Sequence, residues 1–277
     1  MSVRPAFEKA RADGRAALVG YLPAGFPTVA GGITAARAMA EAGVDLVEIG
    51  FPYSDPVMDG PVIQRASEIA LAGGVRAADV MRTVEAVAET GVPVLVMIYW
   101  NLVERYAGAH PVRGVASFAR DLQAAGGSGL ITPDLIPDEA DEWLAVSDEL
   151  GLDRVFLVAP SSTDARVAAT VAACRGFVYA TSVMGVTGAR STTSQAAPAL
   201  VSRVRAAVGQ VNPGLPVGVG LGVSNGDQAA EVGGFADAVI VGSALVSCLA
   251  DVELDAGLRA LRTLTADLAA GVRRGAA

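Results

Sequence analysis

The chain is poor in the side chains that most enzyme chemistry uses, with one histidine, His110, one lysine, Lys9, and two cysteines. Zinc hydrolysis and Ser/His or Cys/His nucleophilic catalysis each need a histidine near a strand end, and His110 would have to serve alone in GAHPVRG. An imine-forming lysine would have to be Lys9, which lies ahead of the first expected strand. We therefore expect no metal site and acid/base chemistry by carboxylates.

The two cysteines, Cys174 and Cys248, lie on or beside expected helices. A cysteine in that setting is usually a small buried apolar residue. We therefore expect neither a disulfide nor a metal-binding pair.

The sequence also lacks an unbroken apolar run of about 18 residues, the length that a membrane span needs. Its hydrophobic content of 52% and mean hydropathy of +0.44 are better explained by parallel strands buried on both faces. The formal net charge of -8 argues against nucleic acid or an anionic membrane as partner. The N-terminal segment has scattered charges and no signal-peptide pattern, so we expect a cytoplasmic protein.

Short β-branched runs alternate with alanine-rich helical stretches along the whole sequence, which is typical of repeated βα units on a parallel sheet. Eight such units predict an α/β fold of the (β/α)8 TIM-barrel type, with residues 1–277 as a single domain. The expected strands are residues 16–22, 45–51, 92–99, 129–132, 154–160, 177–182, 215–220 and 237–243. The expected helices are residues 33–42, 61–72, 77–89, 115–125, 140–150, 165–173, 196–208, 227–232 and 254–272.

Three carboxylates lie where such a barrel builds its active site, at and after the C-terminal end of a strand. Glu48 is late in the second expected strand, and Asp55 and Asp59 lie in the loop SDPVMDGP that follows. Burial raises the pKa of a carboxylate that has no close partner, and a raised pKa suits a proton-transfer residue. Two alternatives stay open: Glu48 could pair with an arginine, and Asp59 could cap the helix that begins at Pro61.

Glycine-rich stretches follow the last three expected strands: GVTG (185–188), GVGLGVS (218–224) and VGSAL (241–245), which also opens a helix. Glycines let backbone N–H groups approach a phosphate closely, and a helix N-terminus adds its dipole. Barrels often bind phosphate at the loops after strands seven and eight. The pattern therefore predicts a small phosphate-bearing substrate, beside a lid-like loop, VMGVTGARSTT (183–193).

Eight segments spread over the chain carry a resemblance to a known family: YLPAGFP, EIGFPYSDPVMDGPVIQ, VMIYWN, LITPDL, VAPSSTDAR, SVMGVTGAR, GLGVS and DAVIVGSALV. Through them, nearly the whole chain resembles the tryptophan synthase alpha subunit family, and EIGFPYSDPVMDGPVIQ is close to the family signature. The resemblance implies retro-aldol cleavage of indole-3-glycerol phosphate to indole and glyceraldehyde 3-phosphate in tryptophan biosynthesis. It also implies a β subunit as partner, in an α2β2 heterotetramer. Pyridoxal phosphate (PLP) is expected in that subunit, and no cofactor in this chain.

The resemblance also assigns roles to the three carboxylates. Glu48 would be the general acid/base that handles C3 of the indole ring and the glycerol hydroxyl proton. Asp59 would hold the indole N–H and stabilise the developing cation, and Asp55 would face the β subunit. The indole ring itself would then be the electron sink, so neither a lysine nor a metal is needed.

Substrate-binding positions carry over from the family in the same way. Two of this chain's residues depart from the family: Leu221 stands where many relatives have phenylalanine, which puts ring affinity in doubt, and Val183 stands where many have arginine. The implied positions are Tyr21 and Tyr179 beside ring and glycerol, Thr187 beside Asp59, Leu221 at the ring, and Gly188, Gly222, Gly242 and Ser243 on the phosphate.

Other functions remain open for the sequence alone. One is a stand-alone lyase that releases free indole, and another is a subunit that mainly activates a partner and has little activity of its own. Glu48 and Asp59 are both present, which speaks against the second of these. A phosphate-sugar isomerase on the same fold is a further alternative.

Overall fold

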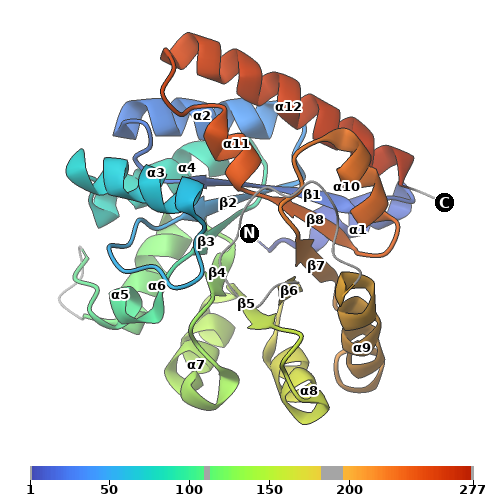
Figure 1. The fold of residues 1–277 in the computed structure, drawn as a ribbon. Coiled ribbons are helices and arrows are strands. Elements are labelled where there is room, and N and C mark those ends of the chain that lie inside the picture. The colour runs from blue at the N-terminus through green and yellow to red at the C-terminus, as the bar shows by residue number, and fades with distance from the viewer. Residues whose placement is uncertain (1, 109–112, 182–195, 276–277) are drawn as a thin grey trace.

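Eight parallel strands close into a barrel in sequence order, and β8 pairs back onto β1 (Figure 1). The computed structural model describes residues 2–108, 113–181 and 196–275. All eight expected strands are confirmed, and their ends differ from expectation by at most two residues. The strands are β1 (Ala17–Pro23), β2 (Leu46–Gly50), β3 (Val94–Met97), β4 (Gly129–Thr132), β5 (Asp153–Val158), β6 (Val178–Thr181), β7 (Val217–Gly220) and β8 (Ala238–Val241).

Helices surround the barrel and match the expected ones, with additions. They are α1 (Arg4–Ala12), α2 (Val29–Glu41), α3 (Pro61–Ala72), α4 (Ala77–Ala88), α5 (Trp100–Glu104), α6 (Val115–Ala124), α7 (Asp141–Leu150), α8 (Asp164–Ala173), α9 (Ala196–Val211), α10 (Gly226–Gly233), α11 (Ser243–Ser247), α12 (Leu254–Arg274) and the 3-10 helix η1 (Pro137–Glu139). The sequence prediction missed α1, α5 and η1.

Two boundaries differ from the prediction for identifiable reasons. Helix α2 begins four residues before the expected start because Thr28 caps it, accepting a hydrogen bond from the Gly31 N–H at 3.0 Å. The third strand ends at Met97 rather than at residue 99, and Trp100 begins α5. The Trp100 N–H donates to the Asp134 carboxylate at 2.9 Å, a contact from another part of the chain that local sequence does not reveal.

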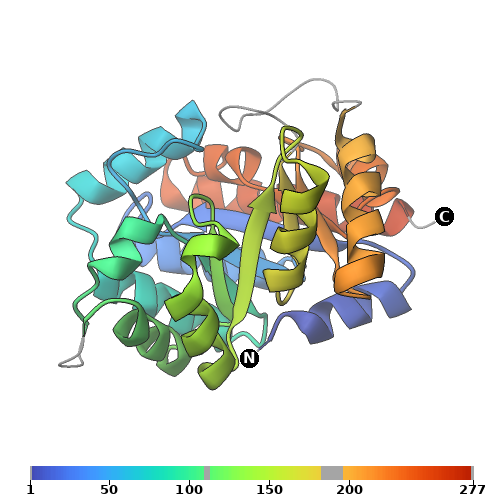
Figure 2. The same cartoon turned by 90° about the horizontal axis from the view of Figure 1, so that it is seen from below.

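Alternate residues of the strands fill the barrel interior. The inner core includes Val19 of β1, Leu46 of β2, Leu95 of β3 and Phe177 just before β6. Helix α1 closes the amino end of the barrel, where Phe7 packs on Phe177 with ring centroids 5.5 Å apart. In Figure 2 the dark blue α1 lies at the lower end of the barrel and the yellow-green strand β5 points upward, away from it, so the carboxyl end of the barrel, where such folds build their sites, is the opposite end.

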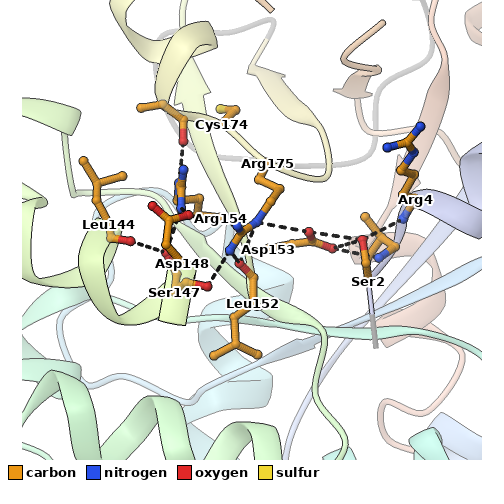
Figure 3. A network of polar contacts seen from close by, with 12 residues as sticks. Ser2, Arg4, Leu144, Ser147, Asp148, Leu152, Asp153, Arg154, Cys174 and Arg175 are labelled. Carbon is orange, nitrogen blue, oxygen red and sulfur yellow. Dashed lines mark hydrogen bonds and ion pairs between the residues drawn. The ribbon is translucent and has the colours of Figure 1, made fainter. Parts of the chain in front are cut away.

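A buried carboxylate ties the start of the chain to the amino end of the barrel (Figure 3). Asp153, the first residue of β5, is 1% exposed and accepts hydrogen bonds from the Val3 N–H at 2.7 Å and from Ser2 Oγ at 2.9 Å. Beside it, Arg154 and Arg175 both pair with Asp148. This network holds α1 against the barrel.

Two expectations from composition can be compared with the structure. Cys174 and Cys248 are free thiols, and the expected burial is found for Cys174, whereas Cys248 is only partly buried. Within the described part of the chain, no helix combines the length and apolarity that a bilayer span requires.

Candidate active site

Glu48 lies inside the barrel near its carboxyl end. It is two residues after the inward-facing Leu46, so the alternation of a strand turns its side chain inward, and it pairs in register with Tyr21 of β1 and Leu95 of β3. The residue is 2% exposed, and its Oε2 atom has no hydrogen-bond partner. Burial, and secondly the charge of Asp59, raise the pKa of Glu48 to about 8.

The arginine alternative for Glu48 is not supported by the structure. Across residues 2–108, 113–181 and 196–275, every ion pair that an arginine makes goes to another carboxylate. Glu48 is therefore a buried acid without a compensating charge in the described structure, which is the environment that raises its pKa.

Asp59 reaches the same site from the loop between β2 and α3. It is 7% exposed, and burial raises its pKa to about 6. The capping alternative is wrong, because Gly60 is the N-cap of α3 and no side chain caps this helix. The backbone of Asp59 is held instead by Gln64, whose Nε2 donates to the Asp59 carbonyl at 2.9 Å.

Two tyrosines from separate strands join the carboxylates. Tyr21 is buried and Tyr179 is half-buried, and burial raises the pKa of each hydroxyl well above 10, with Glu48 and Asp59 adding to the effect. Each hydroxyl lies so close to a strand glycine, Tyr21 at Gly50 and Tyr179 at Gly220, that a Cβ there would overlap it. The four groups Glu48, Asp59, Tyr21 and Tyr179 therefore lie near one another, since the charges of both carboxylates act on both tyrosine hydroxyls.

The glycine-rich ends of β7 and β8 lie side by side, since Gly220 pairs with Ile240. Gly222 has a positive φ of 69°, a conformation that favours glycine. Of the other expected substrate positions here, Leu221 and Ser243 are each 6% exposed, and Gly242 is the N-cap of α11. A Cβ on Gly242 would lie 3.3 Å from Tyr21 Cδ1. The turn at the end of β8 therefore lies next to Tyr21, one of the residues near the carboxylates.

Some expected positions lie elsewhere. Thr187, Gly188 and Val183, like His110, lie outside the described residues. Asp55, unlike the buried Glu48 and Asp59, is exposed, and it accepts a hydrogen bond from Ser54 Oγ at 2.6 Å. Within the described residues, no group of three or more His, Cys, Asp or Glu side chains could hold a metal ion.

One residue of the site was undervalued from the sequence. Tyr99, the last residue of the third expected strand, is 5% exposed, and its hydroxyl accepts hydrogen bonds from the N–H groups of Val57 and Met58. These residues directly precede Asp59. The only sequence signal was the position of Tyr99 near the end of an expected strand.

Comparison with known proteins decides the family. The family model for the tryptophan synthase alpha chain matches residues 7–272. The chain belongs to this family. The alpha chain from Salinispora arenicola is 68% identical over 269 residues, which cover 97% of this chain and 96% of the relative. The alpha chain from Mycobacterium marinum is 60% identical over 98% of this chain and 94% of the relative.

Solved structures agree with this assignment. A chain of Mycobacterium tuberculosis tryptophan synthase superposes with a TM-score of 0.88 at 58% identity, covering 98% of both chains. The alpha subunit from Legionella pneumophila is 30% identical and superposes with a TM-score of 0.82, again over 98% of both chains. Members of the family are carbon-carbon lyases that cleave indole-3-glycerol phosphate to indole and glyceraldehyde 3-phosphate in tryptophan biosynthesis, and this activity is assigned to the chain. The isomerase alternative is thereby excluded.

Proposed function

We propose that Glu48 and Asp59 carry out the cleavage of indole-3-glycerol phosphate as an acid/base pair. The observation that supports this most is that their surroundings separate the pKa values of the two carboxyls, to about 8 for Glu48 and about 6 for Asp59. At pH 7 Glu48 is then mostly protonated and Asp59 mostly ionised. When the pKa values of two carboxyls in one site differ in this way, the group with the higher pKa is the acid and the other is the anion, here Glu48 and Asp59 respectively.

The proton on Glu48 begins the reaction. Glu48 gives it to C3 of the indole ring, and ionised Asp59, beside the ring N–H, stabilises the resulting cation. The Glu48 carboxylate then takes the proton of the glycerol hydroxyl next to the ring. The oxygen lone pair forms the aldehyde, the carbon-carbon bond breaks, and its electrons return to the ring to give indole. Glu48 ends protonated, ready for the next cycle.

The remaining residues would position the substrate. Tyr21 and Tyr179 line the site beside the carboxylates, where they would contact the ring and glycerol. The phosphate would be held by backbone N–H groups at the ends of β7 and β8, since neutral amides bind an anion without a cationic side chain. We assign to this part of the site Leu221 at the ring and Gly222, Gly242 and Ser243 on the phosphate, and keep Thr187 and Gly188 as further contacts by family resemblance.

We also propose a β subunit as the partner, in an α2β2 heterotetramer with PLP in the β subunit. The related Mycobacterium tuberculosis structures are of tryptophan synthase. On this chain, the exposed loop with Asp55 and with Val57, which is 68% exposed, is the proposed contact. A cytoplasmic location remains a prediction.

Replacing the acid tests the mechanism. Glu48→Gln keeps the shape of the side chain but cannot supply the proton, so we expect loss of cleavage with little change in substrate binding. Glu68→Gln, at an exposed position on α3, is the matched control and should behave like the parent. Cleavage would be followed as indole release and binding by calorimetry. Most activity remaining in Glu48→Gln would rule out the proposed proton transfer.

The same assay separates the proposed complex from a stand-alone lyase. Indole release is measured for the full chain with and without a β subunit. We expect the partner to raise the rate. A rate that the partner leaves unchanged would favour the stand-alone enzyme. No cleavage by either preparation would favour the partner-activating role.

A further inference from the structure

The loop that carries Asp59 is held by a side chain from the next βα unit. The Tyr99 hydroxyl oxygen accepts hydrogen bonds from the Val57 N–H at 3.1 Å and from the Met58 N–H at 3.0 Å. Both donors belong to the two residues immediately before Asp59. Two successive amides bound to one oxygen fix the path of the backbone where it enters Asp59.

Tyr99 is itself held rigidly. It is the N-cap residue of α5, and the first N–H of that helix, from Trp100, donates to the Asp134 carboxylate at 2.9 Å. Its ring packs against Tyr53 with centroids 4.8 Å apart, and the Tyr53 hydroxyl accepts a hydrogen bond from Asn101 Nδ2 at 3.0 Å. The hydroxyl therefore presents a fixed acceptor to a loop that has little regular structure of its own.

The environment of Tyr99 includes the reacting carboxylate. Burial, with the charge of Asp59 as the next cause, raises the pKa of the Tyr99 hydroxyl to about 12, so this group stays neutral and keeps its proton. In the described structure, the titratable groups around Asp59 and Tyr99 affect one another's pKa through their charges. These groups are Glu48 of β2, Tyr21 of β1, Tyr179 of β6 and Asp134 after β4.

We propose that Tyr99 is a positioning residue for the lyase reaction, which acts by binding the Val57 and Met58 amides and thereby holds Asp59 against the substrate ring. The inference rests on the role proposed for Asp59 and adds a residue that does not react with the substrate. Productive reaction needs Asp59 placed closely, and misplacing a reacting group by about 1 Å can cost about a hundredfold in rate.

The test is Tyr99→Phe in the full chain, which removes one oxygen and keeps the ring packing. We expect kcat/KM for indole-3-glycerol phosphate to fall by about 10- to 100-fold. Water then reaches the loop, and the burial that raises the pKa of Asp59 lessens, so the acidic limb of the pH profile should move from about 6 to lower pH. The alkaline limb, from Glu48, should stay in place.

Tyr106→Phe is the matched control. Tyr106 is also buried, and its hydroxyl donates to Asp121 at 2.7 Å, away from the loop. This variant should lose some stability and keep the parent pH profile. Parent kcat/KM in Tyr99→Phe, or a loss in rate with the acidic limb unmoved, would overturn the positioning role.

Amide hydrogen exchange gives a second readout that needs no catalysis. In the parent chain we expect the Val57 and Met58 amides to be protected, and in Tyr99→Phe to exchange at least about tenfold faster. Unprotected amides in the parent would overturn the inference even if the variant fails to fold. Asp59→Asn distinguishes the two proposals. If this variant keeps the parent kcat/KM, the role proposed for Asp59 is wrong. If Asp59→Asn loses activity while Tyr99→Phe keeps the parent kcat/KM, only the role proposed for Tyr99 is wrong.

Discussion

Glu48 and Asp59 are both buried carboxyls, but the fold destabilises the charged form of Glu48 more than that of Asp59. Glu48 lies on a strand, enclosed by the barrel wall, with one oxygen that has no partner. Asp59 lies on a loop and is slightly more exposed. The more enclosed group has the higher pKa, since desolvation penalises charge more strongly there.

This difference predicts a bell-shaped pH dependence of kcat/KM. Activity should fall below about pH 6, where Asp59 gains a proton, and above about pH 8, where Glu48 loses its proton. The measurement is kcat/KM for indole-3-glycerol phosphate between about pH 5 and about pH 9, one unit beyond each limb. A rate that keeps rising above pH 8 would contradict an acid role for Glu48.

The raised pKa of Glu48 also costs stability. From pH 4.5, the ordinary pKa, to about pH 8, the folded chain keeps a proton that the unfolded chain releases, so the free energy of unfolding falls as pH rises. Glu48→Gln removes this dependence and should stabilise the chain by about 3 kcal/mol at pH 7 and by much less at pH 4.5. Urea unfolding at both pH values checks this, with Glu68→Gln as control. An equal effect at the two pH values would mean that Glu48 titrates normally.

At the scale of elements, strand glycines make room for the tyrosines of the neighbouring strands. Gly220, the last residue of β7, lies against the hydroxyl of Tyr179 on β6. No other residue type leaves space there without moving the ring. The glycine therefore sets how far Tyr179 can extend toward the site.

Gly220→Ala should thus displace Tyr179 and raise KM or lower kcat. An added Cβ would overlap Tyr179 Oη but would lie 3.1 Å from Cζ, so removing the hydroxyl relieves most of the clash. We expect Gly220→Ala with Tyr179→Phe to lose less activity than the sum of the single changes, as a double-mutant cycle measures. Gly209→Ala on α9, where a Cβ meets nothing within 4 Å, is the control. Strictly additive losses would show that the two residues do not interact.

At the scale of the whole molecule, a set of stabilising contacts and the proposed chemistry lie at opposite ends of the barrel. The amino end, where α1 lies (Figure 2), holds Asp153, Phe7 and the paired arginines, and the carboxyl end holds the proposed acid/base pair. This division is common in TIM barrels. It makes the two properties separable by mutation.

Asp153→Ala should therefore destabilise the chain with little effect on catalysis. It removes the acceptor of the Val3 N–H and Ser2 Oγ and loosens α1, at a cost of about 1 to 3 kcal/mol. The midpoint of thermal unfolding should fall by several degrees, while kcat/KM well below it stays within about twofold of the parent. Glu85→Ala, at an exposed position on α4, should change neither. A large loss of kcat/KM in Asp153→Ala at low temperature would contradict the separation.

The sequence alone determined the barrel and the positions of the two carboxylates, Glu48 on β2 and Asp59 in the loop that follows. Strand and helix periodicity is local, and Glu48 and Asp59 belong to one continuous segment whose strand and loop the pattern indicates. The tertiary structure alone decided what depends on neighbours distant in sequence. Helix α5 begins at Trp100 because Asp134 binds its first N–H, Gly60 rather than Asp59 caps α3, and Tyr99 reaches back to the loop before Asp59. The difference between the pKa values of Glu48 and Asp59 likewise depends on the tertiary structure, since it arises from burial that only the closed barrel creates.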